Sequence, residues 1–299
     1  MRYGWLLACW SLCSGESIEW WHPATAPDGK RGGGGFFASK VVSVFPSNTG
    51  SGFSSHQGVV LLFEAENGAL KCIADAHSIT AIRTAAASAV ATRLLARPEA
   101  CALAILGSGT QARMHLEAIS AVRNITSVAI WSRNAQHAEA FAAAHSTATC
   151  PITVFADSAS AVANADVVCT VTSASSPILR GADLKPGAHV NAVGSCFPTQ
   201  RELDTEAVVR ARLFVDTRDA CLKEPGCIVT PLQEGAIKPE HIVGEIGEVI
   251  AGDIAGRTND TEVTLFKSVG AAVEDLCAVT ALYELAMADA DASTKYPRM

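Results

Sequence analysis

The stretch Ala-Leu-Ala-Ile-Leu-Gly-Ser-Gly-Thr-Gln-Ala at residues 102–112 decides the fold of this chain. A short apolar run leads into G-x-G-x-x-A, and a helical pattern follows. Gly107 suits the tight turn, Gly109 lets the backbone approach a pyrophosphate, and Ala112 permits close helix–strand packing. The N–H groups at the helix start, around Ser108, Thr110 and Gln111, would face the phosphates. Glycine turns of this kind also occur without a nucleotide, so the motif alone leaves both interpretations open.

The next strand indicates which dinucleotide is bound. The strand pattern at 127–131 ends in Ser132-Arg133-Asn134, where an NAD-specific fold usually carries Asp or Glu for the ribose 2′-hydroxyl. Polar and cationic side chains suit a 2′-phosphate instead. We therefore expect NADPH rather than NADH, with these three residues as contacts. The alternative is a solvated arginine at a strand end.

Strand and helix patterns alternate around this motif. Strands are predicted at 101–106, 127–131, 152–155, 167–171, 188–193 and 212–216, and helices at 110–122, 134–145 and 158–164. This alternation predicts an α/β fold with a Rossmann-type, doubly wound parallel sheet. Upstream come a strand at 38–45, a hairpin with strands 59–63 and 69–73 around Asn67-Gly68, and an alanine-rich helix at 81–96. A long helical pattern follows Phe266 and runs to about residue 290.

Composition excludes several classes of protein. With 49% hydrophobic and 18% charged residues, the 299-residue chain is globular and fits one large domain or two ordinary ones. A net charge of −7 and no basic run argue against a nucleic-acid partner, and no segment approaches a membrane span. Ten cysteines without metal spacing indicate reduced thiols, no metal site and a cytoplasmic protein. Residues 1–35 form no clear pattern; Arg2 and the apolar residues after it loosely resemble a signal peptide, which leaves secretion as the alternative.

Eight ordered segments carry a resemblance to a known family. They are Lys40–Pro46, Ser55–Gly58, Ile79–Ala86, the glycine turn with Gln111-Ala112, Lys185–Gly194, Arg201–Asp204, Gly244–Val249 and Phe266–Gly270. Over residues 38–290 the chain resembles the ornithine cyclodeaminase/mu-crystallin family, within it the ketimine-reductase branch. The resemblance implies a homodimer with an NAD(P)-binding Rossmann domain and a smaller α+β domain, built from both chain ends, for substrate binding and dimerisation. We expect these domains at 98–262 and at 1–97 plus 263–299.

Two cations are the best candidates for binding substrate. A 2-imino acid presents a planar carboxylate, which the guanidinium of Arg83 can grip at two points while the ammonium of Lys40 adds a point charge. An arginine that serves only a ligand is expected to have no partner inside the fold. The alternatives are a solvated lysine and an ordinary surface arginine.

The resemblance implies further site residues. Glu224 would face the substrate and stabilise an iminium nitrogen, with a loop-surface glutamate as the alternative. The implied cofactor contacts are His56, Arg83, Thr84, Thr172, Ser173, Val193 and Ser268, which could otherwise be a structural histidine and helix caps.

The sequence departs from the family in two places. In the family a substrate-binding arginine precedes a Met-Pro-Ala segment, of which His22-Pro23-Ala24 would be the relic, and only Arg2 stands upstream here. Cys196 falls where cyclodeaminases carry an essential aspartate, and a thiol replaces neither its charge nor its pKa.

Together these features predict NADPH-dependent reduction of cyclic ketimines of the Δ1-pyrroline-2-carboxylate or Δ1-piperideine-2-carboxylate type. The remaining alternatives are ornithine cyclodeaminase or alanine dehydrogenase chemistry on the same scaffold. A non-catalytic protein that binds NADPH or thyroid hormone, as in mu-crystallins, is the alternative from another class.

Overall fold

A computed structural model of the chain describes residues 17–20, 35–45 and 56–288. The chain divides into two compact units, unit 1 from Met1–Arg83 with Ala271–Met299 and unit 2 from Thr84–Gly270. The N-terminal segment with Arg2 and His22-Pro23-Ala24, and the end of the chain after residue 288, lie outside the described residues.

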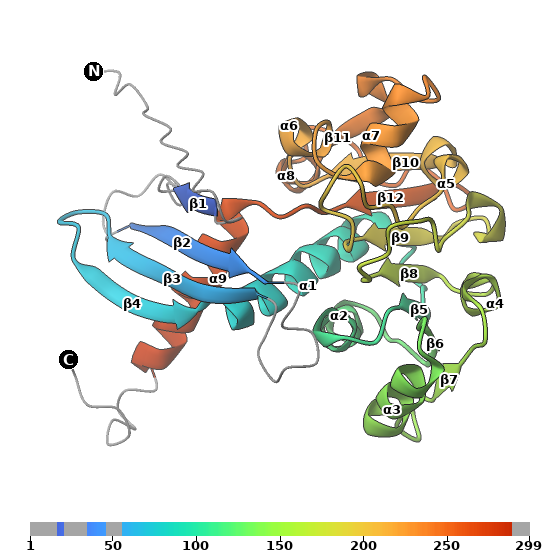
Figure 1. Ribbon diagram of the computed structural model, residues 1–299, viewed down its shortest axis with the longest axis horizontal. Coiled ribbons are helices and arrows are strands. Elements are labelled where there is room, and N and C mark those ends of the chain that lie inside the picture. Colours follow the sequence, from blue (N-terminus) through green and yellow to red (C-terminus); the bar gives the residue numbers. More distant parts are fainter. Residues whose placement is uncertain (1–16, 21–34, 46–55, 289–299) are drawn as a thin grey trace. The chain divides into compact units, whose positions relative to one another are not determined.

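Unit 2 contains an eight-stranded sheet in the order β11-β10-β12-β9-β8-β5-β6-β7, with every neighbouring pair parallel. Its strands are β5 (Ala102–Leu106), β6 (Ser127–Trp131), β7 (Ile152–Val154), β8 (Val167–Thr170), β9 (His189–Ala192), β10 (Ala211–Val215), β11 (Ile242–Glu245) and β12 (Val263–Lys267). The strand order reverses between β5 and β8 (Figure 1). This confirms the predicted Rossmann-type fold, and the six predicted strands match to within one residue at each end.

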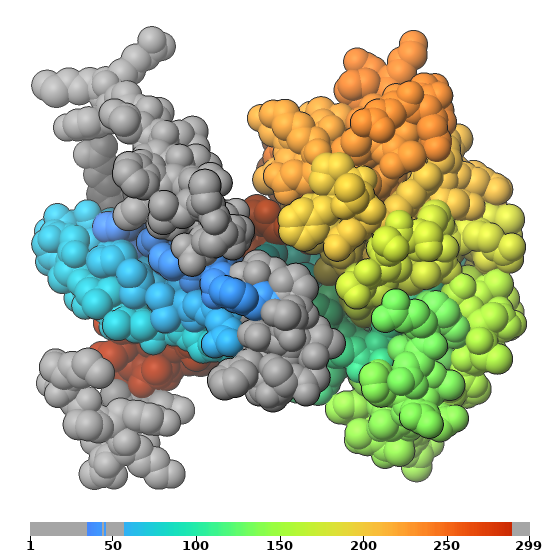
Figure 2. Space-filling view, in the orientation of Figure 1, coloured from blue at the N-terminus to red at the C-terminus, as the bar shows by residue number. Residues whose placement is uncertain are grey.

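Short helices connect these strands. They are α2 (Thr110–Val122), α3 (Ala135–His145), α4 (Ser158–Val162), α5 (Thr205–Arg210), α6 (Arg218–Cys221), α7 (Gly226–Gln233) and α8 (Ile246–Ala251), with 3-10 turns η2 (Gly181–Asp183) and η3 (Pro239–His241). In Figure 2 the surface of unit 2 shows orange, yellow and green segments in succession from top to bottom. Helices α2 to α4 match their predicted ranges to within two residues, whereas β11, β12 and helices α5 to α8 were not predicted.

The expected boundary before residue 263 is wrong, because β12 belongs to the parallel sheet. It pairs with β9 on one side and β10 on the other. All five of its residues are buried, so the segment Val-Thr-Leu-Phe-Lys forms a fully covered strand. The helical pattern starts only afterwards, at α9 (Ala272–Ala288).

Unit 1 combines an antiparallel sheet with helices. Its strands β1 (Ser17–Trp20), β2 (Phe36–Val44), β3 (His56–Glu64) and β4 (Leu70–Asp75) lie in sequence order. The predicted hairpin is confirmed: Gly68 adopts φ +73° between β3 and β4, and the backbone N–H of Ala69 donates to Asn67 Oδ1. One face of the sheet packs against α9 and the start of α1 in a core of small and aliphatic side chains: Ala38, Val60, Leu62, Ala74, Ala76, Ile79, Leu276 and Val279.

The helix predicted at 81–96 starts earlier, as α1 (Ala76–Leu95). Asp75 supplies the missed N-terminal signal, since its carboxylate accepts from the backbone N–H and the hydroxyl of Ser78, both at 2.7 Å. The expected domain boundary at 97/98 also moves, because Ala91 and Leu95 pack with Phe214 and Phe266 of the parallel sheet. The second half of α1 therefore belongs to unit 2.

Candidate functional site

The turn after β5 has the geometry of an anion-binding turn. Gly107 adopts φ +126°, and a Cβ there would lie 2.8 Å from the carbonyl oxygen of Val171. Gly109 begins α2 without a side-chain cap, and a Cβ on it would meet nothing within 4 Å. By contrast α3, α4 and α5 are capped by Asn134, Asp157 and Asp204. No side chain caps the first N–H groups of α2, which leaves them available to a phosphate.

A cavity of about 940 Å³ opens in front of this turn. It lies at the carboxyl ends of β5, β6 and β8, where the strand order reverses and where doubly wound sheets bind ligands. Eight of the predicted contacts line it: Gly107, Ser108, Gly109, Ser132, Arg133, Asn134, Thr172 and Ser173. Lining residues that were not predicted are Trp131, Ala135, Gln136, His137, Val171, Ala174, Ser175, Ser176 and Ile178. Several of them could have been predicted from the sequence, because the serines Ser173, Ser175 and Ser176 follow β8 closely.

The wall after β6 carries an available positive charge. Arg133 is exposed and forms no hydrogen bond or ion pair within the described part of the chain. Asn134 caps α3 by accepting from the backbone N–H of Gln136, and the hydroxyl of Ser108 donates to Ser132 across the turn. Two serines and a guanidinium thus sit beside the glycine turn, as the ribose end of a dinucleotide requires.

Other predicted cofactor contacts lie outside this cavity. Thr110 and Gln111 are in the first turn of α2, whereas Thr84, Val193 and Ser268 are buried in unit 2. His56 begins β3, but its side chain is outside the described residues. Glu224 is exposed between α6 and α7 and does not line the cavity.

In unit 1 the two candidate substrate cations converge on one carboxylate. The Nζ atom of Lys40 lies 3.0 Å from Asp275 Oδ1 and 2.7 Å from the hydroxyl of Thr80. Arg83 Nε lies 3.3 Å from the same Asp275 oxygen. A second carboxylate, Glu274, accepts from Arg83 at 2.8 Å. Two positive charges are therefore held next to each other inside this unit.

This cluster excludes one alternative and overturns one expectation. Lys40 and Arg83 expose only 10% and 11% of their side chains, so neither is a solvated surface cation. Arg83 was expected to have no partner inside the fold, but it is paired with both Glu274 and Asp275. A strand and a helix from one end of the chain meet α9 from the other, a juxtaposition that no local pattern reveals.

Burial favours the neutral ring in the two buried histidines of unit 2, His115 and His189. Burial, reinforced by the nearby charge of Arg257, lowers the pKa of His189 to about 3. Its ring is hydrogen-bonded to Thr264 and Asn191. Burial likewise lowers the pKa of His115 to about 4. Both are neutral structural residues, consistent with the expected inert role of His189.

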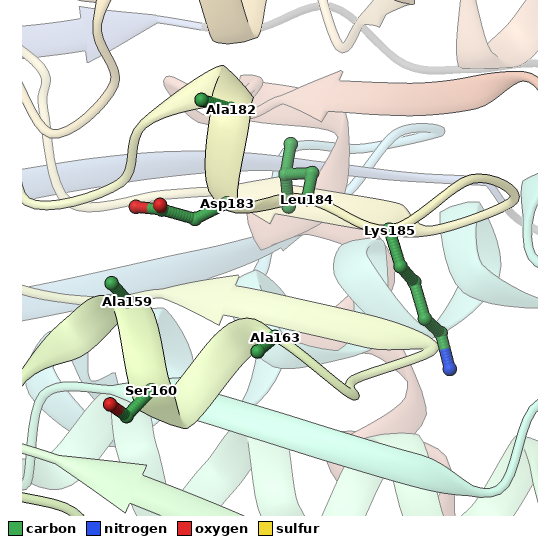
Figure 3. A pocket seen from close by; sticks show the side chains of 7 residues that line it. All are labelled: Ala159, Ser160, Ala163, Ala182, Asp183, Leu184 and Lys185. Carbon is green, nitrogen blue, oxygen red and sulfur yellow. The ribbon is translucent and has the colours of Figure 1, made fainter.

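A second cavity, of about 440 Å³, lies between α4 and η2. Figure 3 shows Ala159, Ser160 and Ala163 on one side of it, facing the segment from Ala182 to Lys185. These elements precede β8 and β9, so the cavity lies at the amino ends of the strands, away from the edge where this fold binds ligands. The Lys185 ammonium is engaged by Asp166 at 2.7 Å. This cavity is therefore not the cofactor site.

The fold defines a Rossmann-type α/β protein. Its glycine turn and the cavity at the carboxyl ends of β5, β6 and β8 suit a dinucleotide. The family model of the ornithine cyclodeaminase/mu-crystallin family matches residues 29–290, and the chain belongs to this family.

Named relatives agree with this assignment. The chain is 44% identical to ketimine reductase mu-crystallin of Mus musculus over 246 residues, which covers 82% of this chain and 75% of that protein. It is similar to the structure of Thermococcus litoralis Delta(1)-pyrroline-2-carboxylate reductase in complex with NADH and L-proline, with TM-score 0.82, 35% identity and coverage of 91% and 88% of the two chains. It is also similar to an archaeal alanine dehydrogenase dimer with bound NAD, with TM-score 0.84, 28% identity and coverage of 94% and 84%.

Proposed function

We propose that this protein reduces cyclic 2-imino acids to cyclic amino acids with a reduced nicotinamide cofactor. The observation that carries the proposal is the convergence of Lys40 and Arg83 on one oxygen of Asp275. Two adjacent cations are what the planar carboxylate of an imino acid requires. The named reductases among the relatives support the same chemistry.

The described residues fit a dinucleotide. The uncapped start of α2 and the open space at Gly109 would receive the pyrophosphate. Arg133 with Ser132 would hold the ribose end, and the segment around Thr172 and Ser173 would hold the other half. The bound cofactor would supply a hydride, and the fold would orient the two reactants.

The remaining work of the site is binding. Lys40 and Arg83 would hold the substrate carboxylate, and Glu224 would stabilise the positive charge of the protonated imine. Cys196 follows β9, half-buried, with its thiol 3.6 Å from the carbonyl oxygen of Val193. A thiol there lacks the carboxylate that cyclodeaminases use, which favours plain imine reduction.

Turnover of the purified protein tests the proposal. We expect oxidation of reduced cofactor with Δ1-pyrroline-2-carboxylate and Δ1-piperideine-2-carboxylate, and no ammonia release from ornithine. Both reactions are followed by the absorbance of the reduced cofactor and by an ammonia assay. Proline accumulating from ornithine without added reductant would show a cyclodeaminase, whereas turnover only of pyruvate with ammonia would show an alanine dehydrogenase.

NADPH is the proposed cofactor, because Arg133 presents a guanidinium beside the cavity. Arg133→Ala should weaken NADPH binding about 10- to 100-fold, since a charge-assisted contact to the 2′-phosphate is worth about 1.5–3 kcal/mol. NADH binding should change little. Dissociation constants for both cofactors check this, with Arg113→Ala on the exposed face of α2 as the matched control for lost charge. An equal loss for the two cofactors contradicts NADPH specificity.

We propose that the protein forms a homodimer through the apolar outer face of the unit 1 sheet. Val41, Val59 and Ile73 are 39%, 38% and 58% exposed there, and the archaeal alanine dehydrogenase relative is described as a dimer. Ile73→Glu should convert the dimer to a monomer in sedimentation experiments. Ile250→Glu in unit 2, where the native side chain is 61% exposed, is the matched control. A monomeric wild-type protein would overturn the proposal.

A cytoplasmic location is also proposed. Cys169, Cys221 and Cys227 are buried free thiols, as is usual in a reducing compartment. Among the described residues, no helix has the length and apolarity needed to cross a membrane. Fractionation of cells that express the protein checks the location, and recovery from the medium would contradict it.

A further inference from the structure

Glu202 is a completely buried carboxylate next to the candidate cofactor site. Its Oε1 atom accepts from the backbone N–H and the hydroxyl of Thr172, both at 2.7 Å. Its Oε2 atom accepts from the hydroxyl of Thr170 and the backbone N–H of Gly194, both at 2.8 Å. All four donors are uncharged, so the carboxylate is held by dipoles alone.

The four hydrogen bonds suit the acceptor-only oxygens of a carboxylate. Each carboxylate oxygen accepts from a backbone N–H, which can donate but never accept. An amide would place its NH2 group, which cannot accept, against one of these N–H groups in a site without water exposure. The position therefore suits the side chain of glutamate rather than that of glutamine.

This charge ties together the ends of two neighbouring strands. Thr170 and Thr172 lie at the end of β8, and Gly194 follows β9, which pairs with β8 in parallel. The packing is tight, because a Cβ on Gly194 would lie 1.9 Å from the carbonyl oxygen of Thr172. Thr172 also lines the 940 Å³ cavity. Glu202 thus sets the position of one wall of the cavity without lining it.

In a dinucleotide bound across this sheet, that wall would face the nicotinamide half. In this strand order a dinucleotide crosses the point between β5 and β8 where the order reverses. The residues proposed to hold the ribose, Ser132 and Arg133, follow β6 on one side of this point. The segment held by Glu202 follows β8, on the other side.

We propose that Glu202 is a positioning residue for the nicotinamide half, and that its buried negative charge makes the site favour the oxidised, cationic ring over the reduced, neutral ring. The inference rests on the proposed function as a nicotinamide-dependent reductase. A fixed anion would also stabilise the positive charge that develops on the ring as the hydride leaves. Low-dielectric surroundings preserve such an interaction.

The test compares cofactor binding in Glu202→Gln and the wild-type protein. We expect the ratio of the dissociation constants for NADP⁺ and NADPH to rise about tenfold, because only the oxidised ring loses a charge–charge attraction. Glu202→Asp keeps the charge on a shorter side chain. Its ratio of dissociation constants should therefore equal that of the wild-type protein, although it should bind both cofactor forms more weakly. Titration calorimetry gives both constants, and melting temperature reports stability separately.

Asp166→Asn is the matched control. Asp166 is another buried carboxylate of unit 2, accepting from the backbone N–H groups of Cys101 and Ala102 at 3.0 Å, but at the amino ends of β5 and β8. The same chemical change there should lower the melting temperature and leave the cofactor ratio unchanged. If the ratio of the NADP⁺ and NADPH dissociation constants in Glu202→Gln equals that of the wild-type protein, this inference is wrong, but the proposed function is not affected. A wild-type protein that binds neither cofactor overturns the proposed function as well.

A milder variant covers the case in which Glu202→Gln does not fold. Thr170→Val removes one hydroxyl donor to Oε2 and keeps the charge and the side-chain shape. We expect kcat for imine reduction to fall about three- to tenfold with an unchanged KM for the imine, because the loosened wall misplaces the ring but not the substrate carboxylate. An unchanged kcat contradicts the positioning role.

Discussion

Arg83→Lys is expected to lower kcat/KM for a cyclic imine about 10- to 100-fold. The substitution keeps the positive charge but removes the planar two-point contact with a carboxylate, and charge-assisted contacts of this kind are worth about 1.5–3 kcal/mol. The charge remains beside Glu274 and Asp275, so neither carboxylate is left without a cation. Steady-state kinetics with the imine, together with melting temperature, measure both effects.

Arg97→Lys is the matched control for this prediction. Arg97 is an arginine of unit 2 whose guanidinium pairs with Asp166 at 2.7 Å, and it lies outside the proposed site. Its substitution should lower the melting temperature and leave the imine kinetics unchanged. If Arg83→Lys behaves in the same way, with lost stability and normal kinetics, Arg83 is a structural residue and does not bind substrate.

Gly109→Ala should weaken binding of either cofactor roughly 10- to 100-fold and leave stability nearly unchanged. The added methyl meets no protein atom within 4 Å, and the backbone angles at this residue, φ −90° and ψ −162°, suit alanine. The methyl would instead occupy the space through which a pyrophosphate approaches α2, a steric conflict of about 1–3 kcal/mol. Calorimetric dissociation constants and thermal melting give the two measurements.

Gly107→Ala, two residues away, should behave differently. Its φ of +126° is strained for alanine, and its Cβ would lie 2.8 Å from the carbonyl oxygen of Val171. We expect this variant to lose both stability and cofactor binding. If Gly109→Ala binds cofactor normally, the turn does not hold the pyrophosphate, and the cofactor part of the proposed function is wrong.

Local patterns determined the parallel sheet and the nucleotide turn. The segment 102–112 combines a strand, a turn and a helix start, so its structure depends on neighbours in sequence. The hairpin at Asn67-Gly68 is local in the same sense, since glycine supplies the positive φ that the turn needs. The residues around Arg133 were predicted because they directly follow the second strand, where an NAD-specific fold usually carries Asp or Glu.

The tertiary structure alone decided the membership of β12, the extent of α1 in each unit and the partners of the charged residues. From the sequence, β12 was assigned to the beginning of the C-terminal segment. In the structure it lies between β9 and β10, and pairing on both edges buries all five of its residues. Lys40 and Arg83 acquire their shared partner Asp275 from a helix at the other end of the chain. Glu202 finds its hydrogen-bond partners at the ends of β8 and β9. Periodicity and turn chemistry are set by adjacent residues, whereas the pairing of buried charges depends on which distant segments pack together.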